Sequence, residues 1–113
     1  ADIDEFSATA IALNAALNDV TLSIATDDLL AGAAPQCDAI LVGDLFYEQS
    51  LALRLLEWLE TAHRRGTRVL IGDPGRAYLP KAHLTQLVTY SVPVTRDLED
   101  AEIKQGAVWT LAF

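Results

Sequence analysis

Residues 39–50 read AILVGDLFYEQS, and this stretch decides the fold class. Its first four residues form a short, continuous apolar run, which is typical of a parallel strand covered on both faces. The run ends in a glycine and Asp44, and Phe46 and Tyr47 follow directly. A buried strand whose end carries a carboxylate and two aromatic side chains predicts a ligand site at that end of the sheet.

The segments around this strand alternate between helix and strand patterns. Apolar residues at helical spacing predict a helix over about residues 48–65, and Gly66 is its expected C-terminal glycine. The next apolar run, TRVLIGD at residues 67–73, predicts a second central strand. Upstream, an Ala-rich helix is expected to end at Asn18 and Asp19, and the period-two pattern of residues 20–25 predicts a strand.

The last third of the chain predicts a short helix and a hairpin. Pro80 is expected at the first turn of a helix that runs to about Val88. Residues 89–94 read as a strand that Pro93 restricts to an edge or bulge, and residues 103–113 predict a closing antiparallel strand. The whole pattern indicates an α/β fold, with a Rossmann-like, mostly parallel sheet and a C-terminal antiparallel β-hairpin.

Composition narrows the function classes. The 113 residues carry 16 acidic and eight basic side chains, a formal charge of −8, which argues against nucleic-acid partners and anionic membrane surfaces. The single cysteine, Cys37, fits a reducing cytoplasm. The chain contains no Met, even at position 1, so we expect a processed or truncated piece of a longer protein.

Each predicted strand that points at the site delivers a carboxylate there. These residues are Asp2, Asp4, Asp27, Asp28, Asp44 and Asp73. Carboxylates suit ribose hydroxyls and amino groups, and the chain has no phosphate-binding loop, so a ligand with a ribose and an amino group is expected. The alternative is that each Asp caps the following helix or turn, which is the usual role of a single Asp after a strand.

The stretches GDLFYE and VLIGDPGRAYLP resemble class I, seven-β-strand S-adenosylmethionine-dependent methyltransferases. More narrowly, they resemble the lysine methyltransferases that act on the electron-transfer-flavoprotein β subunit, and their bacterial relatives. The segments ADID, AIALNAALN, TDDLL and VPVTRDLED extend the resemblance over nearly the whole chain. Residues 1–113 are then expected to be the C-terminal portion of a single methyltransferase domain.

The resemblance implies a role for each candidate residue. Asp2, or less favourably Asp4, matches the acid that holds the ribose hydroxyls of S-adenosylmethionine, and Asp27 or Asp28 matches the acid near the adenine amino group. Asp44 and Tyr47 match the Asp-x-x-Tyr motif that faces the acceptor lysine, where Phe46 is expected to add an aromatic wall. The implied activity is protein-lysine N-methylation, with the electron-transfer-flavoprotein β subunit as the protein substrate.

One part of the family pattern is missing. The family's first strand and its Gly-rich cofactor loop precede the segment that matches ADID, and this chain has neither. We therefore expect an incomplete sheet with an open central edge, and weak or no cofactor binding by the isolated chain.

Two other interpretations remain open at this stage. A receiver-like signalling domain would gather Asp27, Asp28 and Asp44 around a magnesium ion. A non-catalytic interaction module would pair through the open sheet edge, for example as a homodimer. Asp44 could instead cap the helix that follows it, with Phe46 and Tyr47 packed beneath a loop. Arg76 is expected to be an exposed turn residue, with an acidic partner as the other possibility.

Overall fold

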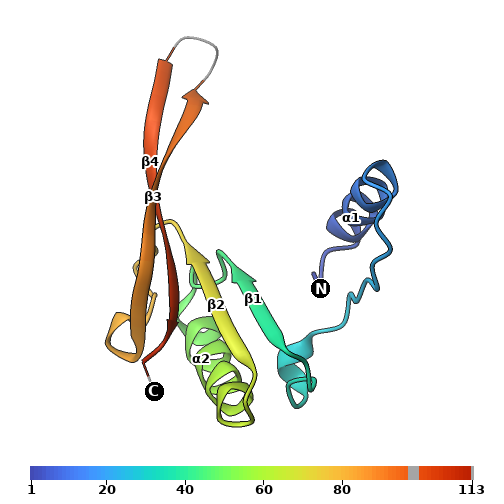
Figure 1. The fold of residues 1–113 in the computed structure, drawn as a ribbon, viewed down its shortest axis with the longest axis vertical. Helices are drawn as coiled ribbons and strands as arrows, with labels where there is room; N and C mark the ends of the chain where they lie inside the picture. The colour runs from blue at the N-terminus through green and yellow to red at the C-terminus, as the bar shows by residue number, and fades with distance from the viewer. Residues whose placement is uncertain (97–99, 113) are drawn as a thin grey trace. The chain divides into compact units, whose positions relative to one another are not determined.

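The structure is a computed structural model that describes residues 1–96 and 100–112 (Figure 1). Its elements, in chain order, are α1 (Glu5–Leu17), η1 (Leu29–Ala31), β1 (Ala39–Gly43), α2 (Gln49–Arg64), β2 (Arg68–Asp73), η2 (Lys81–His83), β3 (Leu84–Arg96) and β4 (Asp100–Leu111). The chain divides into two units, residues 1–33 and the remainder from Ala34, and each is described by itself.

The first unit contains the predicted Ala-rich helix. Asp4 caps α1 by accepting a hydrogen bond from the Phe6 amide, and Asn18 follows as the C-cap. The predicted strand at residues 20–25 is wrong, because the structure assigns no strand there. Its alternating apolar residues are present, but a strand needs a partner to complete its backbone hydrogen bonds, and the segment has no described neighbour in a sheet.

The second unit is built on a four-stranded sheet in the order β1-β2-β4-β3. β1 and β2 are parallel, whereas β4 is antiparallel to both β2 and β3. Among the described strands the sheet is therefore mixed, which corrects the expectation of a mostly parallel one. The C-terminal antiparallel hairpin is confirmed, and β3 lies at an edge, as Pro93 predicted.

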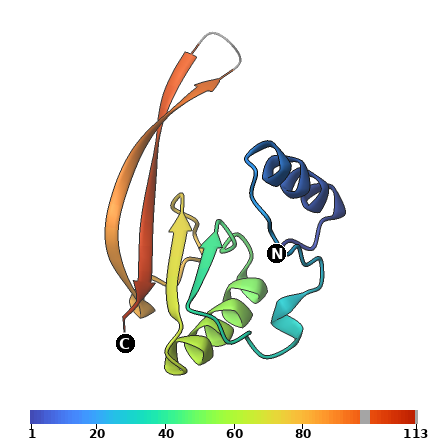
Figure 2. The ribbon, with the colours of Figure 1, turned by 45° about the vertical axis from the view of Figure 1, so that its right-hand side comes forward.

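Helix α2 packs on one face of this sheet against β2 (Figure 2). The largest fully buried side chains of the core are Phe46, Leu55, Leu59, Val69 and Ile71; two of them lie on α2 and two on β2. The opposite face of β1 is open, since Leu41 is 76% exposed. The expectation that β1 is covered on both faces is thus wrong for the described residues, and its outer edge has no described strand partner.

The predicted helix from Pro80 to Val88 is replaced by one short turn and a strand. Only η2 is helical, and β3 already begins at Leu84, which pairs with Leu111 of β4. Pairing with a neighbouring strand outweighed the weak local helix signal. β4 pairs with β2 at residues 107–109, and the parts of the hairpin at residues 90–96 and 100–106 extend beyond β1 and β2 as a two-stranded ribbon (Figures 1 and 2).

Within the described residues, neither α1 nor α2 combines the length and apolar character that a membrane-crossing helix requires.

Candidate functional site

The ends of β1 and β2 lie side by side and bring two carboxylates to one edge of the sheet. The parallel register pairs Gly43 with Gly72. Asp44 follows β1 directly, and Asp73 is the last residue of β2. The Asp44 N–H donates to the Gly72 carbonyl at 2.9 Å, which continues the strand pairing by one residue. The sequence-based expectation that strand ends deliver acids to a shared edge therefore holds for this pair.

Asp44 leaves the strand in an unusual backbone conformation. Its φ is +49°, in the left-handed region that Asp tolerates better than most residues. This conformation turns the chain at the end of β1, and the hydrogen bond to Gly72 holds the turn in place. The position of the Asp44 carboxylate is therefore set by β2 as well as by its own strand.

Arg76 binds the Asp44 carboxylate through two hydrogen bonds, one to each oxygen. Nε donates to Oδ1 at 2.7 Å and Nη2 donates to Oδ2 at 2.8 Å. Both side chains are 46% exposed, so the pair lies at the surface. The planar guanidinium matches a carboxylate in this two-point geometry, which fixes orientation as well as distance.

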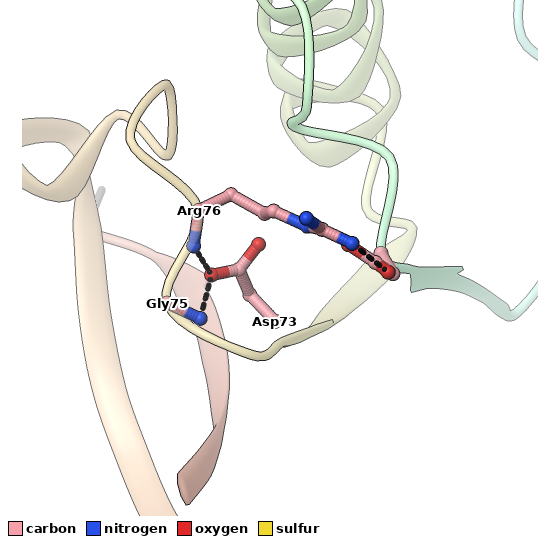
Figure 3. A network of polar contacts seen from close by, with 4 residues as sticks. Asp73, Gly75 and Arg76 are labelled. Carbon is pink, nitrogen blue, oxygen red and sulfur yellow. Dashed lines mark hydrogen bonds and ion pairs between the residues drawn. The ribbon is translucent and has the colours of Figure 1, made fainter. Parts of the chain in front are cut away.

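Asp73 holds the turn from which Arg76 extends (Figure 3). Its Oδ2 accepts hydrogen bonds from the amides of Gly75 (2.7 Å) and Arg76 (2.8 Å). Gly75 has a φ of +103°, which only glycine adopts without strain. Asp73 is 5% exposed, and its Oδ1 is buried without a hydrogen-bond partner among the described residues. The two strand ends and the GDPGR turn thus form one connected network.

The network changes the titration of Asp44. The hydrogen bonds from Arg76 are the largest influence and lower the pKa of Asp44; partial burial opposes them, and the Arg76 charge adds to them. Hydrogen bonding to Asp44 likewise raises the pKa of Arg76. At neutral pH the pair is therefore a carboxylate and a guanidinium whose charges offset each other.

The two aromatic residues after Asp44 have different environments. Phe46 is 0% exposed, so its ring belongs to the core and does not form a wall facing solvent. Tyr47 is 55% exposed and lies at the surface. The N-cap of α2 is Glu48, so Asp44 does not cap this helix. The alternative in which Asp44 caps the following helix and both aromatic rings are packed is therefore right for the burial of Phe46. It is wrong for the cap and for Tyr47.

The four acids expected to bind a cofactor all lie in the first unit. Asp4 caps α1, and Asp28 caps η1 by accepting from the Leu30 amide at 3.0 Å. Asp2 accepts from the Asp4 amide at 2.9 Å. The Asp2 N–H donates to the Ala25 carbonyl at 3.0 Å, which brings Asp2 beside the segment that carries Asp27. Asp4 and Asp28 thus have capping roles, and all four side chains are exposed.

Sequence reasoning missed the partnership of Arg76 with Asp44. The default interpretation, an exposed turn arginine, overlooked that GDPGR follows a strand parallel to the one that ends in GD. Two adjacent strand ends of this kind place a turn residue of one next to the acid of the other. No group of three His, Cys, Asp or Glu side chains suited to a metal occurs among the residues that the structure describes.

Comparison with known proteins identifies one group of relatives. The chain is 37% identical over 114 aligned residues to the electron transfer flavoprotein beta subunit lysine methyltransferase of Danio rerio. Identity is 38% for the Mus musculus enzyme and 34% for the Homo sapiens enzyme. The alignments cover 96% of this chain but only 44%, 45% and 44% of these three relatives.

No family model matches the chain, and no solved structure matches it. The chain spans less than half the length of the curated relatives it matches. The resemblance inferred from the sequence motifs is confirmed: over nearly its whole length, this chain is homologous to the electron transfer flavoprotein beta subunit lysine methyltransferases.

Proposed function

We propose that the chain is part of an S-adenosylmethionine-dependent protein-lysine N-methyltransferase. The observation that carries this proposal is sequence homology over 96% of the chain to proteins named as lysine methyltransferases of the electron transfer flavoprotein beta subunit. That subunit is accordingly the proposed protein substrate. The chain supplies the acceptor side of the site, from Asp44 and Tyr47, and some of the residues that hold the methyl donor.

The open edge of β1 supports a sheet that continues in the longer protein. Among the residues that the structure describes, β1 pairs with β2 alone, and Leu41 on its uncovered face is 76% exposed. In the proposed enzyme, the family's first strand and its Gly-rich loop lie against this edge and complete a Rossmann-like sheet.

The first unit offers side chains that fit an adenosyl group. The hydrogen bond between the Asp2 amide and Ala25 keeps Asp2 close to the segment carrying Asp27, and both carboxylates are exposed. Carboxylates accept hydrogen bonds from ribose hydroxyls and from an amino group. We assign Asp2 to the ribose and Asp27 to the adenine amino group, with Asp4 and Asp28 chiefly holding the backbone. The bound sulfonium would supply an already activated methyl group.

On the acceptor side, the protein must orient a neutral amine. A lysine has a pKa of about 10.4 in water, so its side chain is mostly charged at neutral pH and must lose a proton before it attacks. Each Asp44 oxygen has one lone pair used by Arg76 and another that remains to accept a hydrogen bond from the amine. Tyr47, exposed three residues later, offers an aromatic face to the lysine.

The test is methyl transfer by the full-length enzyme from radiolabelled S-adenosylmethionine to the electron transfer flavoprotein beta subunit. Asp44→Ala and Tyr47→Ala should both lower turnover strongly. Asp38→Ala is the control for Asp44→Ala, because Asp38 lies at the opposite end of β1 from Asp44. Tyr90→Ala is the control for Tyr47→Ala, because Tyr90 and Tyr47 are both 55% exposed. Wild-type turnover in Asp44→Ala or Tyr47→Ala would refute the acceptor-site assignment.

A second measurement concerns the isolated chain. Since it contains no GxGxG loop, calorimetric titration with S-adenosylhomocysteine should show no micromolar binding. Binding in that range would mean that residues 1–113 hold the cofactor unaided.

Of the other interpretations, one retains specific support. The outer edge of β1, which has no described strand partner, could pair with the same edge of a second copy, which would make the chain an interaction module. Light scattering coupled to size-exclusion chromatography distinguishes the two, because a clean monomer excludes this pairing.

A further inference from the structure

The network at the ends of β1 and β2 contains an arginine that the proposed acceptor site does not use. Arg76 contacts the carboxylate assigned to the lysine, and it does so from the turn that follows β2. Its backbone amide is bound by the carboxylate of Asp73, which is 5% exposed. Asp73 also attracts the Arg76 charge. Arg76 is thus held at its backbone by one acid and at its guanidinium by another.

This construction leaves the Asp44 carboxylate little orientational freedom. Its backbone amide is fixed to Gly72, and each of its oxygens receives one Arg76 N–H at 2.7 or 2.8 Å. A single charge contact would fix only a distance, whereas the two-point contact also fixes the plane of the carboxylate. The remaining lone pairs therefore point in defined directions.

The pair also resolves a conflict in the role of Asp44. An isolated carboxylate beside the acceptor attracts a lysine but stabilises its protonated form, which cannot attack. A carboxylate whose charge is offset by a guanidinium retains hydrogen-bonding capacity and stabilises the ammonium less. We propose, on the basis of the function proposed above, that Arg76 is a positioning residue that orients Asp44 and offsets its charge, so that Asp44 aligns the neutral acceptor amine.

The opposite role is the main competitor. If Arg76 instead blocked Asp44, the lysine would have to displace it, and removing Arg76 would improve substrate binding. The two roles predict opposite changes, so kinetics on the full-length enzyme distinguish them. The variants are Arg76→Gln, which removes the charge, and Arg76→Lys, which keeps the charge but cannot reproduce the two-point contact.

For Arg76→Gln we expect kcat/KM to fall by roughly tenfold to a hundredfold, the size of effect that misplacing a reacting group produces. The rising limb of the pH–rate profile should also move to higher pH, because Asp44 now holds the amine protonated. Arg76→Lys should restore the position of the limb but only part of the rate. Arg65→Gln is the matched control, since Arg65 lies beyond the C-terminal end of α2, and it should leave both unchanged.

A measurement without catalysis tests the contact itself. Carboxyl carbon NMR of the full-length protein, with Asp44→Asn to assign the signal, should show the pKa of Asp44 moving back towards its ordinary value in Arg76→Gln. An unmoved pKa would overturn the pair. An unchanged pH–rate profile or an improved KM in Arg76→Gln would overturn the positioning role.

The failure of this inference is distinguishable from failure of the proposed function. If Asp44→Ala is inactive while Arg76→Gln behaves as wild type, Asp44 is the acceptor residue and only the role of Arg76 is wrong. If Asp44→Ala retains wild-type turnover, the acceptor assignment fails, and the role of Arg76 fails with it.

Discussion

The sequence and the structure assign different environments to the ring of Phe46. The sequence predicts that its ring lines the acceptor site, whereas the structure buries the ring completely. Replacing Phe46 with Ala therefore tests which environment the ring occupies. A core ring should affect mainly stability, and a ring facing the lysine should affect mainly substrate binding.

The expected magnitude follows from the burial. Fully burying a Phe side chain contributes about 1.5–3 kcal/mol from water exclusion alone. Removing the ring also leaves a cavity, which brings the typical loss for a buried Phe→Ala change to about 3–5 kcal/mol. Since whole domains are stable by only about 5–15 kcal/mol, this single change should remove a large share of the free energy of unfolding. Phe46→Leu, which leaves a smaller cavity, should lose less than Phe46→Ala.

Urea unfolding of the full-length protein, followed by tryptophan fluorescence, measures this loss as a shift in midpoint at a similar denaturant dependence. Tyr47→Ala is the neighbouring control. The Tyr47 side chain is 55% exposed, so its removal should change the free energy of unfolding by no more than about 0.5 kcal/mol. If Phe46→Ala keeps the wild-type midpoint and instead raises KM for the protein substrate, the ring lines the acceptor site and the packing argument is wrong.

Three further predictions concern the network at the strand ends. Gly75→Ala should destabilise the protein by about 1–2 kcal/mol, because Gly75 has a φ of +103°, and the control Gly106→Ala should not, because Gly106 has no positive φ. Urea unfolding midpoints measure both variants, and equal midpoints would contradict the argument from backbone strain. Asp73→Ala should lower the free energy of unfolding by about 1–3 kcal/mol, and Asp73→Asn should lower it less, because its amide oxygen still accepts hydrogen bonds. Equal losses of stability for the two variants in thermal melts would contradict the importance of these hydrogen bonds. The lowered pKa of Asp44 means that its pair with Arg76 stabilises the fold fully above about pH 4, the ordinary range of an Asp, and that this stabilisation is lost as the pH falls through the lower folded value. The difference in urea midpoint between wild type and Arg76→Gln should therefore be largest at pH 7 and shrink progressively as the pH is lowered below about 4, and a difference that does not change with pH would contradict this.

The elements that sequence reasoning predicted correctly have strong local signals. Helix α2 has a stripe of apolar residues and a terminal glycine with positive φ at Gly66, and β2 is a continuous apolar run. The closing hairpin follows from two strand patterns without a helix between them. Predictions failed where a partner strand decides the outcome. Residues 20–25 alternate correctly but have no described strand neighbour, and Leu84 joined a strand because β4 is available to pair with it.

The sequence by itself determined that Asp44 and Asp73 stand at the ends of two neighbouring strands, that Asp44 and Tyr47 have the Asp-x-x-Tyr spacing, and which proteins are relatives. These properties depend on residue type and on spacing along the chain. Only the tertiary structure decided that Phe46 is core while Tyr47 is exposed, and that Arg76 binds Asp44 from 32 residues away. The physical reason is that burial and two-point pairing depend on which strands lie side by side, and here the parallel register of β1 and β2 sets that arrangement.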